Sequence, residues 1–352
     1  MLKPFRSNQA GVKPHKDYGI FGPDSVTWKV FRYPTSFTVG FQRTVVTEMF
    51  EPFLLASVTA TGAVKNRPAA RYDRTLQYVA TVAFADSDTV TKSADTLVDI
   101  HNYIRGIEPI SGGSYDANDP EAQLWIHLTQ WHSVLMAYEI FGPGKLSPAE
   151  EEQYWAECRR AAAFQTIDPD TVPRNRQEMR DYYARMRPRM AATEATQETV
   201  QHLLNASAFL MDGAPPFAKP FATIAKSLFK RATLATLPKW MRSLGGVQQN
   251  ALLDTAAILA MRAMVRTLAL LPDAVMLEMV HWASPGTAKI VAPIALDVQP
   301  VLAETVTPEQ AWKNAGRPTP AVQYAQHKLQ RSKTPPKHAP KDPGITKLRK
   351  LA

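Results

Sequence analysis

Cysteine is nearly absent from this sequence, because Cys158 is the only one among 352 residues. A single cysteine excludes a disulfide framework, a cysteine-rich zinc site and a cysteine-ligated iron–sulfur cluster within one chain. At this length the chain can bury a sizeable hydrophobic core, so its stability does not require covalent cross-links. The cysteine content is compatible with a reducing compartment.

Several other sequence signals are also missing. There is no P-loop, no glycine-rich dinucleotide fingerprint, no His-Glu-x-x-His and no Gly-x-Ser-x-Gly. Charged residues interrupt the most apolar stretch, residues 251–271, whereas a membrane-spanning helix needs about 20 residues with few or no charges. This stretch is expected to be a helix packed among other helices, or at most an interfacial one. The first 19 residues are polar and basic without an apolar segment, which predicts a cytoplasmic protein.

The net charge of +9 is unevenly distributed. Residues 326–352 hold eight basic residues and one acid, a net +7, which leaves the rest of the chain close to neutral. A nucleic-acid-binding protein would need a basic body, so no nucleic-acid partner is expected. Proline and charge rise from about residue 301, and we expect residues 301–352 to form a disordered Pro- and Lys-rich tail. Such a tail is able to attach a protein peripherally to an anionic membrane.

Hydrophobic periodicity predicts a mainly α fold: one large helical domain over residues 20–300, preceded by an irregular arm over residues 1–19. Pro120 and the capping box at residues 147–150 mark two helix starts. Ser93 is expected to cap the helix that carries His101, and Gly106 to end it. A loop is expected to follow up to about residue 115.

Basic, hydroxyl and imidazole groups concentrate between residues 71 and 127. Arg71 and Thr75 lie four residues apart on one face of a predicted helix, with Arg74 beside that face. His101 lies within the apolar stripe of the next predicted helix. Such a histidine either forms hydrogen bonds in the core or offers a neutral nitrogen to a metal, and a solvated helix face would equally explain the arginines. The pattern alone leaves both interpretations open.

Two kinds of iron centre can be compared with this cluster. A di-iron carboxylate bundle needs two Glu-x-x-His motifs, and the sequence has one, from Glu278 to His281. A haem needs one proximal histidine, an apolar pocket and cations for its propionates. The candidate parts are His101 with Leu97, Ile104 and Trp131 for the iron and the pocket, and Arg71, Arg74 and Arg105 for the propionates.

With these residues the sequence resembles the family of rubber oxygenases (latex clearing proteins) and MpaB-like oxygenases, which are mainly α-helical proteins that bind haem b. The resemblance covers roughly residues 20–190, and the order and spacing of its motifs together carry it. The motifs are Gly22-Pro23-x-Ser25 with Trp28, Glu51-Pro52, Arg71-x-x-Arg74-Thr75, His101 followed by Gly106, Tyr115, Trp125-Ile126-His127, and Tyr138 with Phe141-Gly142.

This resemblance implies a haem oxygenase in which His101 is the proximal ligand of the iron. It also implies that Arg71, Arg74 and Thr75 lie on the distal side. Rubber-cleaving members carry a lysine at the place of Arg74, and a guanidinium cannot ligate iron as a lysine can. The difference suggests an open or water-bound distal site, with Arg74 as a hydrogen-bond donor to oxygen.

Other residues are assigned in the same way. His127 matches a second histidine near the haem, and Glu51, or else Glu48, matches a glutamate assigned as a base in some members. The family cleaves double bonds of polyisoprene and terpenoid side chains with dioxygen, so we expect oxidation and cleavage of a double bond in a smaller apolar, isoprenoid- or lipid-like molecule. The alternative is a haem-free helical binding module for an apolar ligand, attached peripherally to a membrane through the basic tail.

Overall fold

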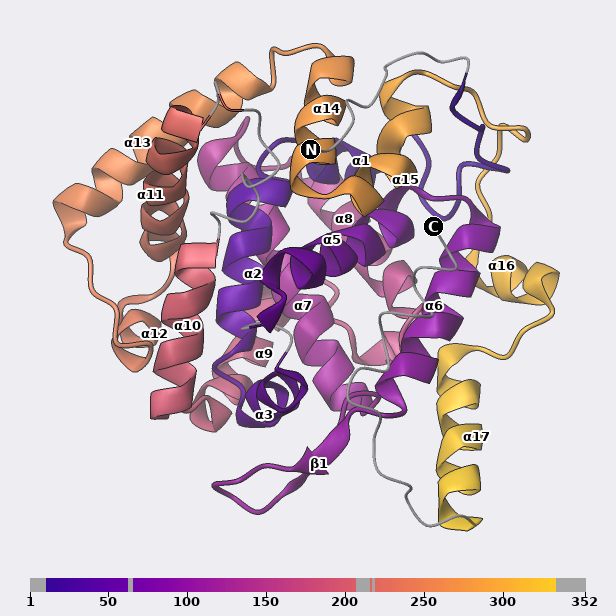
Figure 1. The fold of residues 1–352 in the computed structure, drawn as a ribbon. Coiled ribbons are helices and arrows are strands. Elements are labelled where there is room, and N and C mark those ends of the chain that lie inside the picture. The colour runs from indigo at the N-terminus through magenta and orange to yellow at the C-terminus, as the bar shows by residue number, and fades with distance from the viewer. Residues whose placement is uncertain (1–10, 63–65, 207–215, 217–218, 334–352) are drawn as a thin grey trace.

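The computed structural model describes all residues except 1–10, 63–65, 207–215, 217–218 and 334–352. Helices dominate the described residues, which confirms the predicted mainly α class (Figure 1). Up to residue 189 the helices are α1 (Val26–Phe31), η2 (Ser36–Gly40), α2 (Phe41–Glu48), α3 (Pro52–Thr61), α5 (Pro68–Phe84), α6 (Ser87–His101), α7 (Pro120–Phe141), α8 (Pro148–Ala162), η3 (Pro169–Thr171), α9 (Arg176–Met186) and η4 (Arg187–Arg189). They are followed by α10 (Glu194–Ala206), α11 (Lys219–Thr236), α12 (Lys239–Leu244), α13 (Ala251–Leu268), α14 (Asp273–Ala283), α15 (Pro285–Ala295), α16 (Pro308–Ala315) and α17 (Pro320–Lys333).

Local sequence signals set several helix ends. Pro120 is the first residue of α7, and Ser147 forms the capping box of α8 with Glu150, both as predicted. The start of α6 differs from the prediction, because Asp86 and not Ser93 is the N-cap. The Asp86 carboxylate accepts a hydrogen bond at 2.8 Å from the amide of the third helical residue. The helix therefore begins about two turns earlier than predicted.

α7 runs through the middle of the molecule (Figure 1). It packs against α2, η2, α8 and α13, and its large side chains are buried on several sides of the helix. Trp131, for example, packs at 5.1 Å between ring centroids against both Phe31 and Tyr154. The hydrophobic cluster around it includes residues from Ile20 to Trp312. Segments from both ends of the described chain therefore share one core.

Residues 105–116 form a β-hairpin, whereas the prediction was a helix that ends at Gly106 and then a loop. Strand β1 (Arg105–Ile107) pairs antiparallel with β2 (Ser114–Asp116), and Gly106 lies opposite Tyr115. Gly106 does not end α6, which stops at His101. A side chain at Gly106 would meet the Tyr115 hydroxyl group, which lies 2.6 Å from the position of a Cβ atom. Glycine is needed here for close cross-strand packing.

Part of the predicted disordered tail is helical. Both α16 and α17 pack against α6. Ion pairs between Arg317 and Asp95 and between Arg331 and Asp116, each at 2.6 Å, hold this segment in place. The prediction of disorder is therefore wrong for residues 308–333, and residues 334–352 lie outside the described part of the chain.

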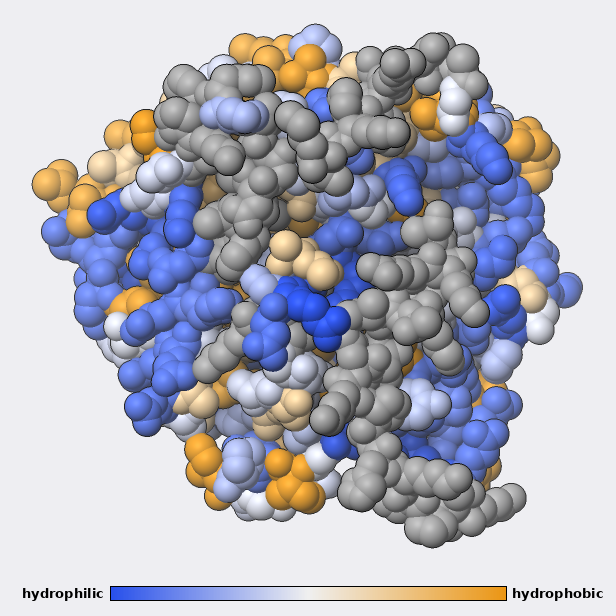
Figure 2. All heavy atoms as spheres, in the orientation of Figure 1, coloured by the Kyte–Doolittle hydropathy of each residue, from blue (hydrophilic) through white to orange (hydrophobic). Residues whose placement is uncertain are grey.

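For helix α13 the structure contradicts the first prediction, a helix packed among other helices, and leaves the second, an interfacial helix, untested. It lies at the edge of the molecule, where it packs on α11 and α7, and is not surrounded by other helices (Figure 1). Leu252 and Leu259 on its outer side are 78% and 58% exposed, and Figure 2 shows hydrophobic side chains along this edge. Over the described residues, no helix has both the length and the apolar character that crossing a membrane requires.

Candidate functional site

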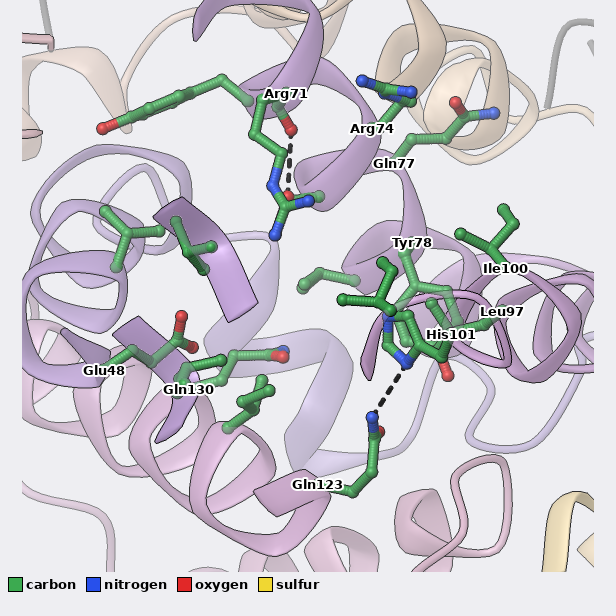
Figure 3. Close-up of a pocket in the computed structure, with 18 of the residues that line it drawn as sticks. Glu48, Arg71, Arg74, Gln77, Tyr78, Leu97, Ile100, His101, Gln123 and Gln130 are labelled. Atoms are coloured by element: carbon green, nitrogen blue, oxygen red, sulfur yellow. Dashed lines mark hydrogen bonds between the residues drawn. The ribbon is translucent and has the colours of Figure 1, made fainter. Parts of the chain in front are cut away.

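A cavity of about 780 Å³ lies among α2, α3, α5, α6 and α7 (Figure 3). This volume is within the range of about 300–1,000 Å³ that is typical of small-molecule and cofactor sites. Much of the wall is apolar, formed by Phe41, Val45, Leu54, Val58, Leu97, Ile100 and Ile104. The polar groups that reach it include Glu48, Arg71, Arg74, Thr75, Tyr78, His101, Gln123, Gln130 and Gln165.

His101 is the last residue of α6, and its imidazole lines the cavity. Its Nδ1 atom lies 3.0 Å from Nε2 of Gln123 on α7 (Figure 3). Burial, followed by the nearby Arg71 guanidinium, lowers the pKa of His101 to about 4. The ring is therefore neutral at physiological pH, and a neutral imidazole has one nitrogen lone pair to offer a metal.

The predicted distal residues Arg71, Arg74 and Thr75 all line the cavity from α5, but they point in different directions. Arg71 extends into the cavity between Glu48 and His101, whereas Arg74 points away from His101 (Figure 3). Burial and then repulsion from Arg74 lower the pKa of Arg71, and the Glu48 carboxyl opposes this effect. The Thr75 hydroxyl donates to the Arg71 carbonyl oxygen at 2.9 Å. Arg71 is therefore the better placed of the two arginines to contact a bound molecule.

The structure separates the two candidate glutamates. Glu51 is the N-cap of α3, where its carboxylate accepts a hydrogen bond from the Leu54 amide at 2.7 Å, and it does not line the cavity. Glu48 does line the cavity, and burial raises its pKa to about 8 against the opposing influence of Arg71 and Thr129. The first choice, Glu51, is therefore a helix cap, and Glu48 is the carboxyl group that faces the site.

Two other predicted site residues lie away from the cavity wall. The sequence predicted that Trp131 lines the haem pocket. This prediction is wrong, because Trp131 is 3% exposed within the aromatic core and does not line the cavity. His127 is also buried, with its ring nitrogens 2.8 Å from Gln165 Oε1 and 2.9 Å from the Cys158 carbonyl oxygen. Both residues lie on the side of α7 that faces the core. His127 reaches His101 only through Gln165 and Gln123.

The cavity side of α7 carries residues that the sequence reasoning missed. Gln123, Ile126 and Gln130 lie three or four residues apart, which places them on one face of the helix. The sequence offered one signal for this face, the presence of Gln123 and Gln130 in an otherwise apolar helix, because a buried amide needs hydrogen-bond partners. Gln123 is 2% exposed and has partners at both ends of its amide.

Cations line the more exposed part of the cavity. Arg105 on β1, which the sequence predicted as a cation for the haem propionates, lines this part, and so does Lys92 on α6, which was not predicted. Among the described residues, no three His, Cys, Asp or Glu side chains converge on a point where they would hold a metal ion. Side chains in this region therefore offer a single imidazole, together with cations and the partly buried carboxyl group of Glu48.

These features define a mainly helical protein with a cofactor-sized internal site. Residues 28–270 match the family described as ER-bound oxygenase mpaB/B'/Rubber oxygenase, catalytic domain. Because the match covers more than half of the chain, the protein belongs to this oxygenase family, which confirms the resemblance seen in the sequence. Neither the curated proteins nor the solved structures include a match to this chain.

Proposed function

We propose that the protein is a haem b-dependent oxygenase that adds dioxygen-derived oxygen to a double bond of an apolar, isoprenoid- or lipid-like molecule and cleaves that bond. Membership of an oxygenase family supports oxidation in general terms. The observation that supports haem as the cofactor is the position of His101, a neutral imidazole beside apolar side chains in a cavity of about 780 Å³. When bound, haem would supply the activation of dioxygen.

The residues around His101 suit a haem. Leu97, Ile100 and Ile104 offer apolar contacts for a porphyrin, and Lys92 and Arg105 offer cations for its propionates. Because a porphyrin supplies most of the ligands of its iron, it needs only one imidazole from the protein. The side chains described here provide that arrangement and not a set of three or more ligands for a bare ion.

Glu48 and Arg71 would act on a substrate held beside the cofactor. Glu48 keeps its proton up to about pH 8, so it is able to hold a proton near the substrate and to exchange it. Arg71 remains charged and donates hydrogen bonds to oxygen atoms. Arg74 and Thr75 line the same wall and complete the proposed distal group. The apolar walls around them exclude water and position the alkene.

We further infer that the partners are dioxygen and an apolar small molecule, and that the protein contacts a membrane surface peripherally. The basic C-terminal residues support this contact, since an anionic surface attracts them. The family description also includes ER-bound oxygenases. The cytoplasmic location stays a prediction from the sequence.

The absorption spectrum of the purified protein tests the cofactor. We expect a Soret band that His101→Ala removes. His281→Ala is the matched control, because His281 lies on α14 outside the cavity lining, and this variant should keep the band. Colourless protein that does not take up added haem would refute the proposal. Dioxygen uptake that depends on an isoprenoid alkene, followed with an oxygen electrode, then tests the reaction.

A further inference from the structure

Gln123 and Gln165 connect His101 on the cavity wall with the buried His127. Gln123 Nε2 lies 3.0 Å from His101 Nδ1, and Gln123 Oε1 accepts a hydrogen bond from Gln165 Nε2 at 2.8 Å. Gln165 Oε1 in turn lies 2.8 Å from His127 Nδ1. Side chains from α6, α7 and the segment after α8 therefore form one continuous hydrogen-bond chain, which we call the relay.

Each member of the relay has one donor side and one acceptor side. A neutral imidazole carries one N–H and one lone pair, and an amide presents its NH₂ on one side and its oxygen on the other. Burial lowers the pKa of His127 to about 4, so this ring is neutral at physiological pH. Hydrogen bonds in the relay must then all run in one direction, either from His127 towards His101 or from His101 towards His127.

The two directions satisfy different backbone carbonyl groups. If donation runs towards His101, Gln123 Nε2 also donates to the Ala117 carbonyl oxygen, and His127 Nε2 is left to accept from the Cys158 thiol at 3.4 Å. If donation runs towards His127, the Nε2 proton of His127 is donated to the Cys158 carbonyl oxygen, 2.9 Å away. Neither direction satisfies both ends, so the two directions compete.

The direction also decides which nitrogen of His101 carries the proton. Donation towards His101 puts its proton on Nε2, the ring nitrogen that points into the cavity (Figure 3). Donation away from His101 puts the proton on Nδ1 and leaves the Nε2 lone pair free. Only the second direction allows His101 to bind a metal from the cavity side.

We propose that Gln123 and Gln165 form a reversible relay that couples metal binding at His101 to the tautomer of His127. The proposal rests on the proposed function in one respect, that His101 binds the metal of the cofactor. Binding through Nε2 places the single proton of His101 on Nδ1, turns both amides, and moves the single proton of His127 from Nδ1 to Nε2. Gln123 is thus a positioning residue, whose oxygen accepts from Nδ1 and makes His101 a stronger electron donor.

Nitrogen-15 NMR of the full chain with labelled histidine measures these tautomers directly. In the haem-free protein we expect protons on His101 Nε2 and His127 Nδ1, because Gln123 then keeps its bond to the Ala117 carbonyl. Zinc protoporphyrin IX, a diamagnetic probe that takes one axial imidazole, should move both protons to the other ring nitrogen. The Gln165→Met variant should still bind the porphyrin, but binding should no longer change the tautomer of His127. Gln130→Met, on the same cavity wall but outside the relay, should leave the coupling intact.

Two results would overturn the relay. One is a haem-free protein in which both histidines carry their proton on the same kind of nitrogen, because no single direction of donation produces that state. The other is a His127 tautomer that stays the same after the porphyrin has bound. Failure of the porphyrin to bind would refute the proposed function instead, while the haem-free spectrum would still show whether the two histidines carry their protons on opposite nitrogens.

Discussion

Glu48 is a carboxyl group on a cavity wall with little access to water. Burial raises its pKa from an ordinary value of 4.5 to about 8, although Arg71 and Thr129 favour the charged form. Between these two pH values the folded state holds a proton that the unfolded state releases. Glu48 therefore lowers the free energy of unfolding progressively as the pH rises from about 4.5 to about 8.

Replacing Glu48 with glutamine tests this linkage. Glu48→Gln keeps the shape of the side chain and removes its charge, so we expect the variant to exceed the wild type in free energy of unfolding by a few kcal/mol at pH 9. The difference should shrink towards zero as the pH approaches 4.5. Urea unfolding between pH 5 and pH 9 measures it, and Glu152→Gln on the exposed side of α8 is the control. A difference that is constant over this range would contradict the raised pKa.

At the residue level, helical spacing predicts which residues share a face, but it does not say which of two faces of a buried helix meets the cavity. His101 lines the cavity as its stripe suggested, but His127 and Trp131, four residues apart on α7, face the core and not the cavity. Glu51 carried a signal of its own, since an acidic residue before a proline is a common helix start. The Glu51-Pro52 pair thus predicts a helix cap at Glu51, which leaves Glu48 as the carboxyl group for the site.

At the level of elements, α17 holds the end of α6 that carries His101. Arg331 on α17 donates to the side chain of Asn102, the residue after His101, at 2.6 Å. The same guanidinium donates to Asp116 at the end of β2, also at 2.6 Å. One side chain therefore fixes both Asn102, the residue that caps the C-terminal end of α6, and the base of the hairpin that bears Arg105.

Removing the Arg331 guanidinium should weaken the packing of α17 against the end of α6 that carries His101. We expect Arg331→Ala to lower the free energy of unfolding by about 1–3 kcal/mol, since it removes the ion-pair partner of the partly buried Asp116 carboxylate. Gln330→Ala, an exposed neighbour on α17, should have little effect. Urea unfolding of the two variants decides the point. Equal stability of both variants and the wild type would show that α17 does not support α6.

Local and long-range interactions account for which elements were predicted. Helices α7 and α8 begin at proline and capping signals that act within a few residues, so the sequence located them correctly. Helices α16 and α17 depend on partners more than 200 residues away, such as Asp95 for Arg317 and Asp116 for Arg331. Composition alone suggested disorder there, because no local pattern announces a distant ion pair.

Charge is distributed unevenly over the whole molecule, and this bears on where the protein works. Residues 334–352 contain five basic residues and one acid, while much of the chain before them is near neutral. Each basic residue near an anionic membrane contributes about 1 kcal/mol of attraction, which salt screens. An oxygenase with an apolar substrate would gain from this contact, because such a substrate concentrates in lipid.

Deleting residues 334–352 separates this attraction from the chemistry of the cavity. We expect the full chain to bind vesicles that contain phosphatidylserine, and the deletion to weaken binding at low salt by at least about tenfold. A full-length variant with the order of residues 334–352 scrambled should bind like the wild type, because the attraction depends on charge and not on sequence. Binding that is unchanged by the deletion and persists at high salt would reject the tail as the attachment. Such a result would instead point to an apolar contact, for which the exposed outer side of α13 is one surface.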